Sequence, residues 1–403
     1  MTAEQHFFIQ LLSDHIHCRP SYPENNDLDW NKILYYAEEQ ALPGMIYIQT
    51  RDFFREHPGA APEAAERLHR GFYSDIYLYA NRKAELKEIA GRCREVPMVL
   101  MKGSVVQESY PVPALRSMGD IDIIIHTEDR EKTDAVMQAE GYSRMIDNHA
   151  VWTYDKEHIE FEIHDHMFYE YLANDIDYRS YFDQVWEHVH LLNGTENIYI
   201  PDENFHFLFL ITHLAKHITN KGMGFRAFLD LVFMTQNKGE QMDWQWIQSE
   251  LKKLKLLQFT KTCFAFCQRW FDVNMPIETM GLDERFYKEV SAKMFSDGIF
   301  GLENEENIAA HSAKEIKRSK DPYWISALKL TFHRLFPPYR DMQLVSWYQF
   351  VDGRPWLLPA AWVYRWFYTA THKFRQSRYL LTEPYKKRKA IEKRENMIRD
   401  WGL

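Results

Sequence analysis

The stretch that decides the fold covers residues 96–126 and reads VPMVLMKGSVVQESYPVPALRSMGDIDIIIH. Its first part, Met98 to Met101, is an apolar run that stops at Lys102-Gly103-Ser104, which is typical of a strand followed by a turn. Its last part, Ile121 to Ile125, is β-branched apart from Asp122. The stretch therefore predicts two strands joined by a glycine turn and a short helix.

The residues that follow extend this unit by a helix and two more strands. Residues 127–142, TEDREKTDAVMQAEGY, have the composition of a capped helix stopped by its penultimate glycine. Two β runs, residues 150–154 and 158–164, are separated by the polar turn Asp155-Lys156-Glu157. Together these elements predict a small α/β unit over residues 96–200.

The regions on either side of this unit have helical periodicity. The second of them opens with PDENFHFLFLITHLAKHITN, for which Asp202 is the predicted N-cap and Lys221-Gly222 the predicted C-cap. The sequence therefore predicts an α+β fold, in which a small mixed β-sheet core is flanked by helical regions. The predicted domains are an N-terminal helical region at 1–95, the core at 96–200, and a larger C-terminal helical region with a basic tail at 201–403.

Length, charge and cysteine content indicate a globular protein of the cytoplasm. The 403 residues exceed the roughly 250–300 that a single core usually holds, and 12 Trp, 23 Tyr and 26 Phe argue against disorder. The N-terminus lacks the basic and apolar regions of a signal peptide, and no apolar run approaches the roughly 20 residues of a membrane span. Cys263 and Cys267 have helical spacing, which favours burial over a metal or redox site. We expect no membrane partner.

The net charge of −9 is distributed unevenly along the chain. Residues 365–399 hold eleven Lys or Arg and three Glu, so the remaining residues are strongly acidic. Such a tail is typical either of a solvated terminal helix or of a segment that binds an anionic partner such as RNA. The sequence leaves both readings open.

Acidic side chains on two of the predicted strands point to metal chemistry. Because side chains alternate along a strand, Asp120 and Asp122 share one face, as do Glu160, Glu162 and His164 on the later strand. Burying two aspartates without a counter-charge is costly, and Mg²⁺ or Mn²⁺ is the counter-ion that carboxylates and phosphates favour together. A third carboxylate would complete a two-metal arrangement.

The opening stretch resembles the signature of the polymerase-β-like nucleotidyltransferase superfamily, in which a hydrophobic-Gly-Gly/Ser turn precedes Asp-x-Asp/Glu and a third acid lies on a later strand. It resembles more closely a branch of uncharacterised nucleotidyltransferases with Leu-Lys-Gly, Tyr-x-x-Pro-x-x-Arg and Asp-Ile-Asp. The positions that match here are Met101-Lys102-Gly103, Tyr110, Pro113, Arg116 and Asp120-Ile121-Asp122.

The same branch carries an acid-x-His on the third strand, matched here by Glu162-Ile163-His164 with Glu in place of the commoner Asp. The longer side chain leaves the metal geometry open. The helical half of that branch has a His-x-x-x-His followed by Gly, Arg and Asp. These are matched by His213, His217, Gly224, Arg226 and Asp230.

The resemblance implies a metal-dependent enzyme that moves a nucleoside monophosphate from an NTP, with ATP as the favoured donor, to an acceptor with release of pyrophosphate. It implies that Asp120 and Asp122 hold the metals, and that Glu162 binds the catalytic metal and helps to remove the acceptor's proton. Glu160 is the rival for that role. The implied nucleotide-binding residues at the turn are Lys102, Gly103, Ser104 and Arg116.

The helical half leaves two interpretations open. His206, Leu210, His213 and His217 fall on one helical face, and the helix lacks the glutamate of a metalloprotease H-E-x-x-H motif. The residues at His213, His217, Arg226 and Asp230 form either a polar network that positions base, ribose or acceptor, or a structural network between domains. His164 is likewise either a ligand or a hydrogen-bonded partner.

Two further expectations concern the aromatic C-terminal region and the alternative function. Trp324, Leu328 and Phe332 stand at helical spacing, as do Trp362 and Trp366, which favours core packing over a base-stacking surface. The alternative function is a non-catalytic module that senses nucleotide or docks a partner. The sequence specifies neither the acceptor, which could be a small molecule, a protein or RNA, nor the oligomeric state.

Overall fold

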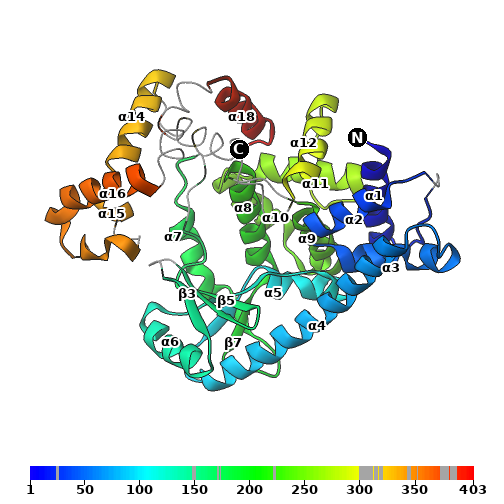
Figure 1. Ribbon diagram of the computed structural model, residues 1–403, viewed down its shortest axis with the longest axis horizontal. Coiled ribbons are helices and arrows are strands. Elements are labelled where there is room, and N and C mark those ends of the chain that lie inside the picture. Colours follow the sequence, from blue (N-terminus) through cyan, green and yellow to red (C-terminus); the bar gives the residue numbers. More distant parts are fainter. Residues whose placement is uncertain are drawn as a thin grey trace.

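The computed structural model describes residues 1–23, 27–147, 151–169, 172, 174–220, 224–298, 312, 316, 321–342, 346–351, 353–372, 381 and 388–403. Figure 1 shows a twisted sheet in the lower part of the molecule with most of the helices above and to its right. The predicted α+β class, with a mixed sheet between helical regions, is confirmed.

Within the described residues, seven strands form one mixed sheet in the order β3-β4-β5-β2-β1-β7-β6. At its centre, β2 pairs in parallel with β5 and antiparallel with β1, and β1 pairs in parallel with β7. The strands are β1 (Met98–Leu100), β2 (Asp120–Ile124), β3 (Ser143–Asp147), β4 (Val151–Lys156), β5 (Ile159–His164), β6 (Val189–Leu191) and β7 (Ile198–Pro201).

Helices precede, interrupt and follow the sheet. Before it come α1 (Ala3–Ile16), α2 (Trp30–Glu39), α3 (Pro43–Glu56) and α4 (Pro62–Arg92). Among the strands lie α5 (Gly103–Val106), α6 (Arg130–Ala139) and α7 (Tyr178–Phe182). After it come α8 (Glu203–Asn220), α9 (Phe225–Lys238), α10 (Trp244–Lys253), α11 (Leu257–Phe271), α12 (Glu284–Asp297), α14 (Tyr323–Leu335), α15 (Tyr339–Met342), α16 (Leu358–His372) and α18 (Arg388–Asp400).

The two faces of the sheet belong to different hydrophobic clusters. Leu100, Ile121 and Ile123 pack with residues of α4 and α6 on one face. Val99 and Ile124 point to the other face and join the larger cluster, which is built mainly from helices. Since Asp120 and Asp122 alternate with Ile121 and Ile123 along β2, the carboxylates lie on the face toward the larger cluster.

Aromatic side chains tie the N-terminal helices to the C-terminal ones. Phe8 of α1 packs edge-on against Phe295 of α12 and lies at a centroid distance of 6.1 Å from Phe225 of α9. Figure 1 shows α1 and α2 beside α9, α11 and α12 at the right of the molecule. The 31-residue α4 runs from this core down to the sheet. Helices from both ends of the chain therefore share one hydrophobic core.

Most elements predicted around the sheet are present. β1, β2, β4, β5 and α6 form near their predicted positions, and Gly141 ends α6 with φ +85°. Asp202 caps α8 as predicted, since its Oδ1 accepts a hydrogen bond of 2.9 Å from the amide of Phe205. The predicted C-cap Lys221-Gly222 lies outside the described residues. Strands β3, β6 and β7 were not predicted.

The cysteine prediction is also confirmed, and no disulfide is present. Cys263 and Cys267 have no exposed surface in α11, and burial raises the pKa of both thiols. Within the described residues, no helix combines the length and apolar character that crossing a membrane requires.

The interpretation of the aromatic stripe in α14 is wrong. Trp324, Leu328 and Phe332 are each more than half exposed, because α14 turns its opposite face, with Ala327 and Leu330, inward. Helical spacing shows which residues share a face, and it does not show which face is covered. In α16, Trp366 is 37% exposed, and both its indole and that of Trp362 donate to backbone carbonyls.

The end of the basic tail is partly described. Helix α18 leads to Trp401, which packs between Phe259, Phe266 and Phe286. The basic residues at 373–378, 386 and 387 lie outside the described residues. The two readings of the tail therefore both stay open.

Candidate active site

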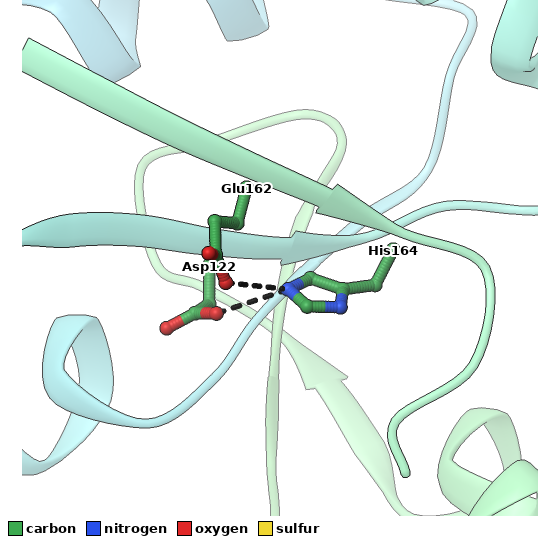
Figure 2. Close-up of side chains that lie close together, drawn as sticks. All are labelled: Asp122, Glu162 and His164. Atoms are coloured by element: carbon green, nitrogen blue, oxygen red, sulfur yellow. Dashed lines mark hydrogen bonds and ion pairs between the residues drawn. The ribbon is translucent and has the colours of Figure 1, made fainter. Parts of the chain in front are cut away.

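Three side chains on adjacent strands converge at the centre of the sheet. The parallel register places Asp122 opposite Glu162 and Asp120 opposite Glu160. His164 Nε2 lies 3.0 Å from Asp122 Oδ1 and 3.4 Å from Glu162 Oε2, and Figure 2 shows these side chains pointing toward one another. One ligand atom from each of the three residues lies within 4.8 Å of the others, so the cluster could hold a metal ion.

Lys102 places a positive charge against these carboxylates. It lies in the turn after β1 with φ 52°, a conformation that residues other than glycine rarely adopt. Its ammonium contacts Asp122 Oδ1 and lies 3.8 Å from Glu162 Oε2. Burial lowers the pKa of Lys102, but the surrounding carboxylates outweigh this effect and raise it above its ordinary value. The turn therefore supplies a cation to the site.

The two aspartates of β2 have different electrostatic environments. Partial burial and the charge of Asp122 raise the pKa of Asp120 to about 6. Burial would also raise the pKa of Asp122, but Lys102 and His164 outweigh it and hold that pKa well below its usual range. Asp122 therefore carries its negative charge at neutral pH. A cation bound beside Asp120 would stabilise the charged form of that carboxylate.

Glu162 and Glu160, the two rivals for the third carboxylate, differ in their surroundings. Both are half-buried on the same face of β5, but only Glu162 belongs to the cluster with Asp122 and His164. Burial, together with the charges of Glu162, Asp155 and Asp122, raises the pKa of Glu160. The geometry therefore favours Glu162 as the third ligand.

The turn glycine, Gly103, packs against two side chains that follow it in the sequence. A Cβ at Gly103 would lie 2.5 Å from Arg116 Nη1 and 2.7 Å from Met118 Sδ. Ser104 is buried, and its hydroxyl lies 3.7 Å from the Met118 sulfur. The residues predicted to cradle a phosphate therefore lie directly against the segment that leads into β2.

We expect Gly103→Ala to destabilise the fold by about 1–3 kcal/mol, because the added methyl group would overpack a site whose Arg116 neighbour is held by Asp230. Gly91→Ala in α4 is the matched control, since a Cβ there would meet nothing within 4 Å and alanine favours helix. Urea denaturation of both variants checks this. Equal stabilities for the two variants would contradict the packing.

A buried network joins this segment to α9. Arg116 Nε and Nη2 donate to the two carboxylate oxygens of Asp230 at 2.8 and 2.7 Å, and Tyr110 donates to Oδ1 at 2.7 Å. All three residues are less than a tenth exposed. Arg226 Nη1 donates to the carbonyl of Ser117 at 2.8 Å. Arg116, Asp230 and Arg226 thus hold the helical region against the segment that leads into β2.

The predicted residues of the helical half meet at one small cavity. His213 and His217 of α8 lie side by side, with their Nε2 atoms 3.3 Å apart. A cavity of about 110 Å³ is lined by both histidines together with Arg116, Arg226 and Asp230. Burial and the neighbouring His217 lower the pKa of His213, which is therefore neutral at pH 7. The structure brings these five predicted residues together.

Sequence reasoning missed two polar residues of α4 near the site. Asp75 accepts hydrogen bonds from the Ser117 hydroxyl at 2.8 Å and from the amide of Gly44 at 3.2 Å, and burial raises its pKa to about 6. Arg82 is also buried, beside the carbonyl of Gly119. Both are charged positions in an otherwise ordinary amphipathic helix, so the sequence carried no signal for them.

A mixed sheet with converging carboxylates, preceded by a glycine turn, is the arrangement expected for nucleotidyl transfer. The chain matches, over residues 26–272, the family described as uncharacterised nucleotidyltransferase, and it belongs to that family. The protein is thus a nucleotidyltransferase, a transferase of phosphorus-containing groups. No curated protein and no solved structure matches the chain.

Proposed function

We propose that the protein transfers a nucleoside monophosphate from an NTP, with ATP as the favoured donor, to an acceptor and releases pyrophosphate. The observation that carries this proposal is the convergence of Asp122, Glu162 and His164 in a chain of this family. In the reaction, an acceptor oxygen forms a bond to the α-phosphorus as the bond from that phosphorus to the pyrophosphate oxygen breaks. The acceptor's proton passes to the carboxylate of Glu162.

The donor set fits a hard divalent cation, and we propose Mg²⁺ or Mn²⁺ held by Asp120, Asp122 and Glu162. When bound, such an ion offsets the charge that develops on the phosphate and activates the attacking oxygen. His164 orients Asp122 through the contact from Nε2. Without a bound metal, the ammonium of Lys102 offsets the charge of these carboxylates. A bound metal would take over that role, and the Lys102 ammonium could then contact a phosphate oxygen.

The residues around the carboxylates would hold the nucleotide. Gly103 and Ser104 would bind the triphosphate, with Arg116 fixed behind the turn. The cavity lined by His213, His217, Arg226 and Asp230 would take base, ribose or acceptor. We propose accordingly that residues 96–200 carry the chemistry in the cytoplasm, while residues 1–95 and 201–403 shape the site.

The test uses the full chain, each of the four NTPs labelled at the α- or the γ-phosphate, Mg²⁺ or Mn²⁺, and cell extract as the source of acceptor. We expect the α-label to move to an acceptor and the γ-label to appear as pyrophosphate. Transfer of the γ-label alone would show phosphoryl transfer instead. Absence of transfer together with absence of NTP binding by calorimetry in Mg²⁺ would overturn the proposal. Binding without transfer would indicate a nucleotide-sensing module.

A further inference from the structure

Exposed apolar side chains gather on two helices of the C-terminal region. Figure 1 shows α14 and α16 at the left of the molecule, with α1 and α2 on the opposite side. The residues of this aromatic patch are Trp324, Leu328 and Phe332 on α14 and Val363, Tyr364, Trp366 and Phe367 on α16. Each is between 37% and 71% exposed. Single exposed apolar residues are common on proteins, but a group of this kind marks an interaction surface.

The two halves of the aromatic patch adjoin each other. The ring centroid of Phe336, just after α14, lies 4.9 Å from that of Phe332 in α14 and 5.1 Å from that of Trp366 in α16. The Trp366 indole also donates a hydrogen bond of 2.8 Å to the carbonyl of Leu335. The exposed stripes of α14 and α16 therefore meet around Phe336 and form one surface.

Helix α16 reverses the usual amphipathic arrangement. A helix on the surface of a protein normally turns its charged residues outward. In α16, Arg365 is half-buried, and its Nη2 donates to the carbonyl of Arg334 at 3.4 Å. Among the residues of α16 whose burial is described, the exposed ones are all uncharged: Pro359, Ala360, Val363, Tyr364, Trp366, Phe367 and Thr371. Such a face is costly in water and favours contact with an apolar phase.

Positive charge follows the aromatic patch in the chain. Neither α14 nor α16 contains an Asp or Glu, although the chain has 58 of them. Lys329 of α14 pairs with Asp321 at 2.6 Å, so its charge is offset. The sequence then continues from α16 into residues 373–389, which hold seven Lys or Arg and one Glu. Because residue 373 follows α16 directly, this basic segment begins where the exposed face of α16 ends.

These features favour a lipid surface over RNA and over a second copy of the chain. Exposed Trp, Phe and Leu beside a cluster of Lys and Arg are typical of segments that lie in the interface of an anionic bilayer. Surfaces that stack RNA bases combine the aromatics with a basic groove for the phosphates, and the exposed face of α16 carries no charge. A symmetric dimer through the patch would bring two basic segments of like charge together.

We propose that the aromatic patch of α14 and α16 binds the surface of an anionic phospholipid bilayer. The aromatic side chains enter the boundary between headgroups and acyl chains, and the basic residues after α16 attract the acidic headgroups. The expectation of no membrane partner rested on the lack of a spanning segment, and binding to a surface requires none. The proposal does not depend on the transfer reaction.

The test measures co-sedimentation of the full chain with vesicles of phosphatidylcholine alone or of phosphatidylcholine with one third phosphatidylglycerol. We expect the anionic vesicles to bind the protein about tenfold or more tightly than the neutral ones. Added salt should weaken this binding, because it screens the attraction between the basic segment and the headgroups.

Phe367→Glu is the variant that tests the aromatic patch. Phe367 is 71% exposed, so the substitution places a negative charge on the patch without opening the core. We expect it to weaken binding to the anionic vesicles by about tenfold or more. Tyr77→Glu is the matched control, since Tyr77 is 66% exposed on α4, outside the patch, and should leave binding unchanged. Circular dichroism checks that both variants fold.

Several results would overturn the proposal. The first is no binding of the wild-type chain to anionic vesicles, or equal binding to neutral and anionic ones. The second is unchanged binding by a folded Phe367→Glu protein. A dimer that forms without vesicles and is lost in Phe367→Glu would assign the patch to a second copy of the chain. Binding of single-stranded RNA that is lost in the same variant would assign the patch to RNA.

Discussion

Asp122→Asn is expected to lower the rate of nucleotide transfer by about 10²–10³-fold with the fold retained, because the substitution keeps the side-chain volume and removes the charge that would hold the metal. Asp122 contacts Lys102 and His164 and is 2% exposed. Rates are measured with α-labelled NTP, and circular dichroism checks the fold.

Glu160→Gln provides the matched control for this experiment. It removes a carboxylate from the same face of β5 without touching the cluster of Asp122, Glu162 and His164. We expect it to retain most of the transfer rate, whereas Glu162→Gln should resemble Asp122→Asn. Calorimetric titration with Mn²⁺ gives a second readout, since the two damaging variants should also lose affinity for the metal. A wild-type rate of nucleotide transfer in the Asp122→Asn variant would show that Asp122 does not hold a catalytic metal.

The strands that carry the acidic cluster could be predicted because their signals are local. The apolar run before Lys102, the Asp-x-Asp alternation and the Glu-x-His alternation each specify which side chains share a face. The pairing of the strands could not be predicted from the sequence. β3 and β4 lie between β2 and β5 in the chain, yet in the sheet β2 pairs directly with β5, and β3 and β4 lie beyond β5. Only that pairing brings Asp122 opposite Glu162.

The remaining features depend on contacts between distant parts of the chain. β6 and β7 have three and four residues, too few for a clear alternating pattern. Arg82 and Asp75 approach the site because α4 crosses both hydrophobic clusters, and a helical pattern does not reveal what its polar face meets. The exposed stripe of α14 has the same cause. Periodicity defines a face, and tertiary packing decides whether that face is covered.

Asp230→Ala is expected to destabilise the protein by about 3–5 kcal/mol, because it leaves the Arg116 guanidinium buried without its partner. Asp230 also accepts the hydrogen bond of Tyr110. The matched control is Glu289→Ala in the exposed pair with Arg285, which lies at 3.1 Å and should contribute no more than about 0.5 kcal/mol. Urea denaturation measures both free energies of unfolding. A loss below about 1 kcal/mol at Asp230 would show that the network is dispensable.

A double-mutant cycle decides whether that loss belongs to the ion pair. Replacing both partners, as Arg116→Met with Asp230→Leu, removes the buried charge along with its counter-charge, so the double variant should be more stable than the sum of the single losses predicts. Because Arg116 Nη1 also supports Gly103, the double variant should lose transfer activity even where it recovers stability. Additive losses would mean that Arg116 and Asp230 act separately, and that the pair does not couple α9 to the segment that leads into β2.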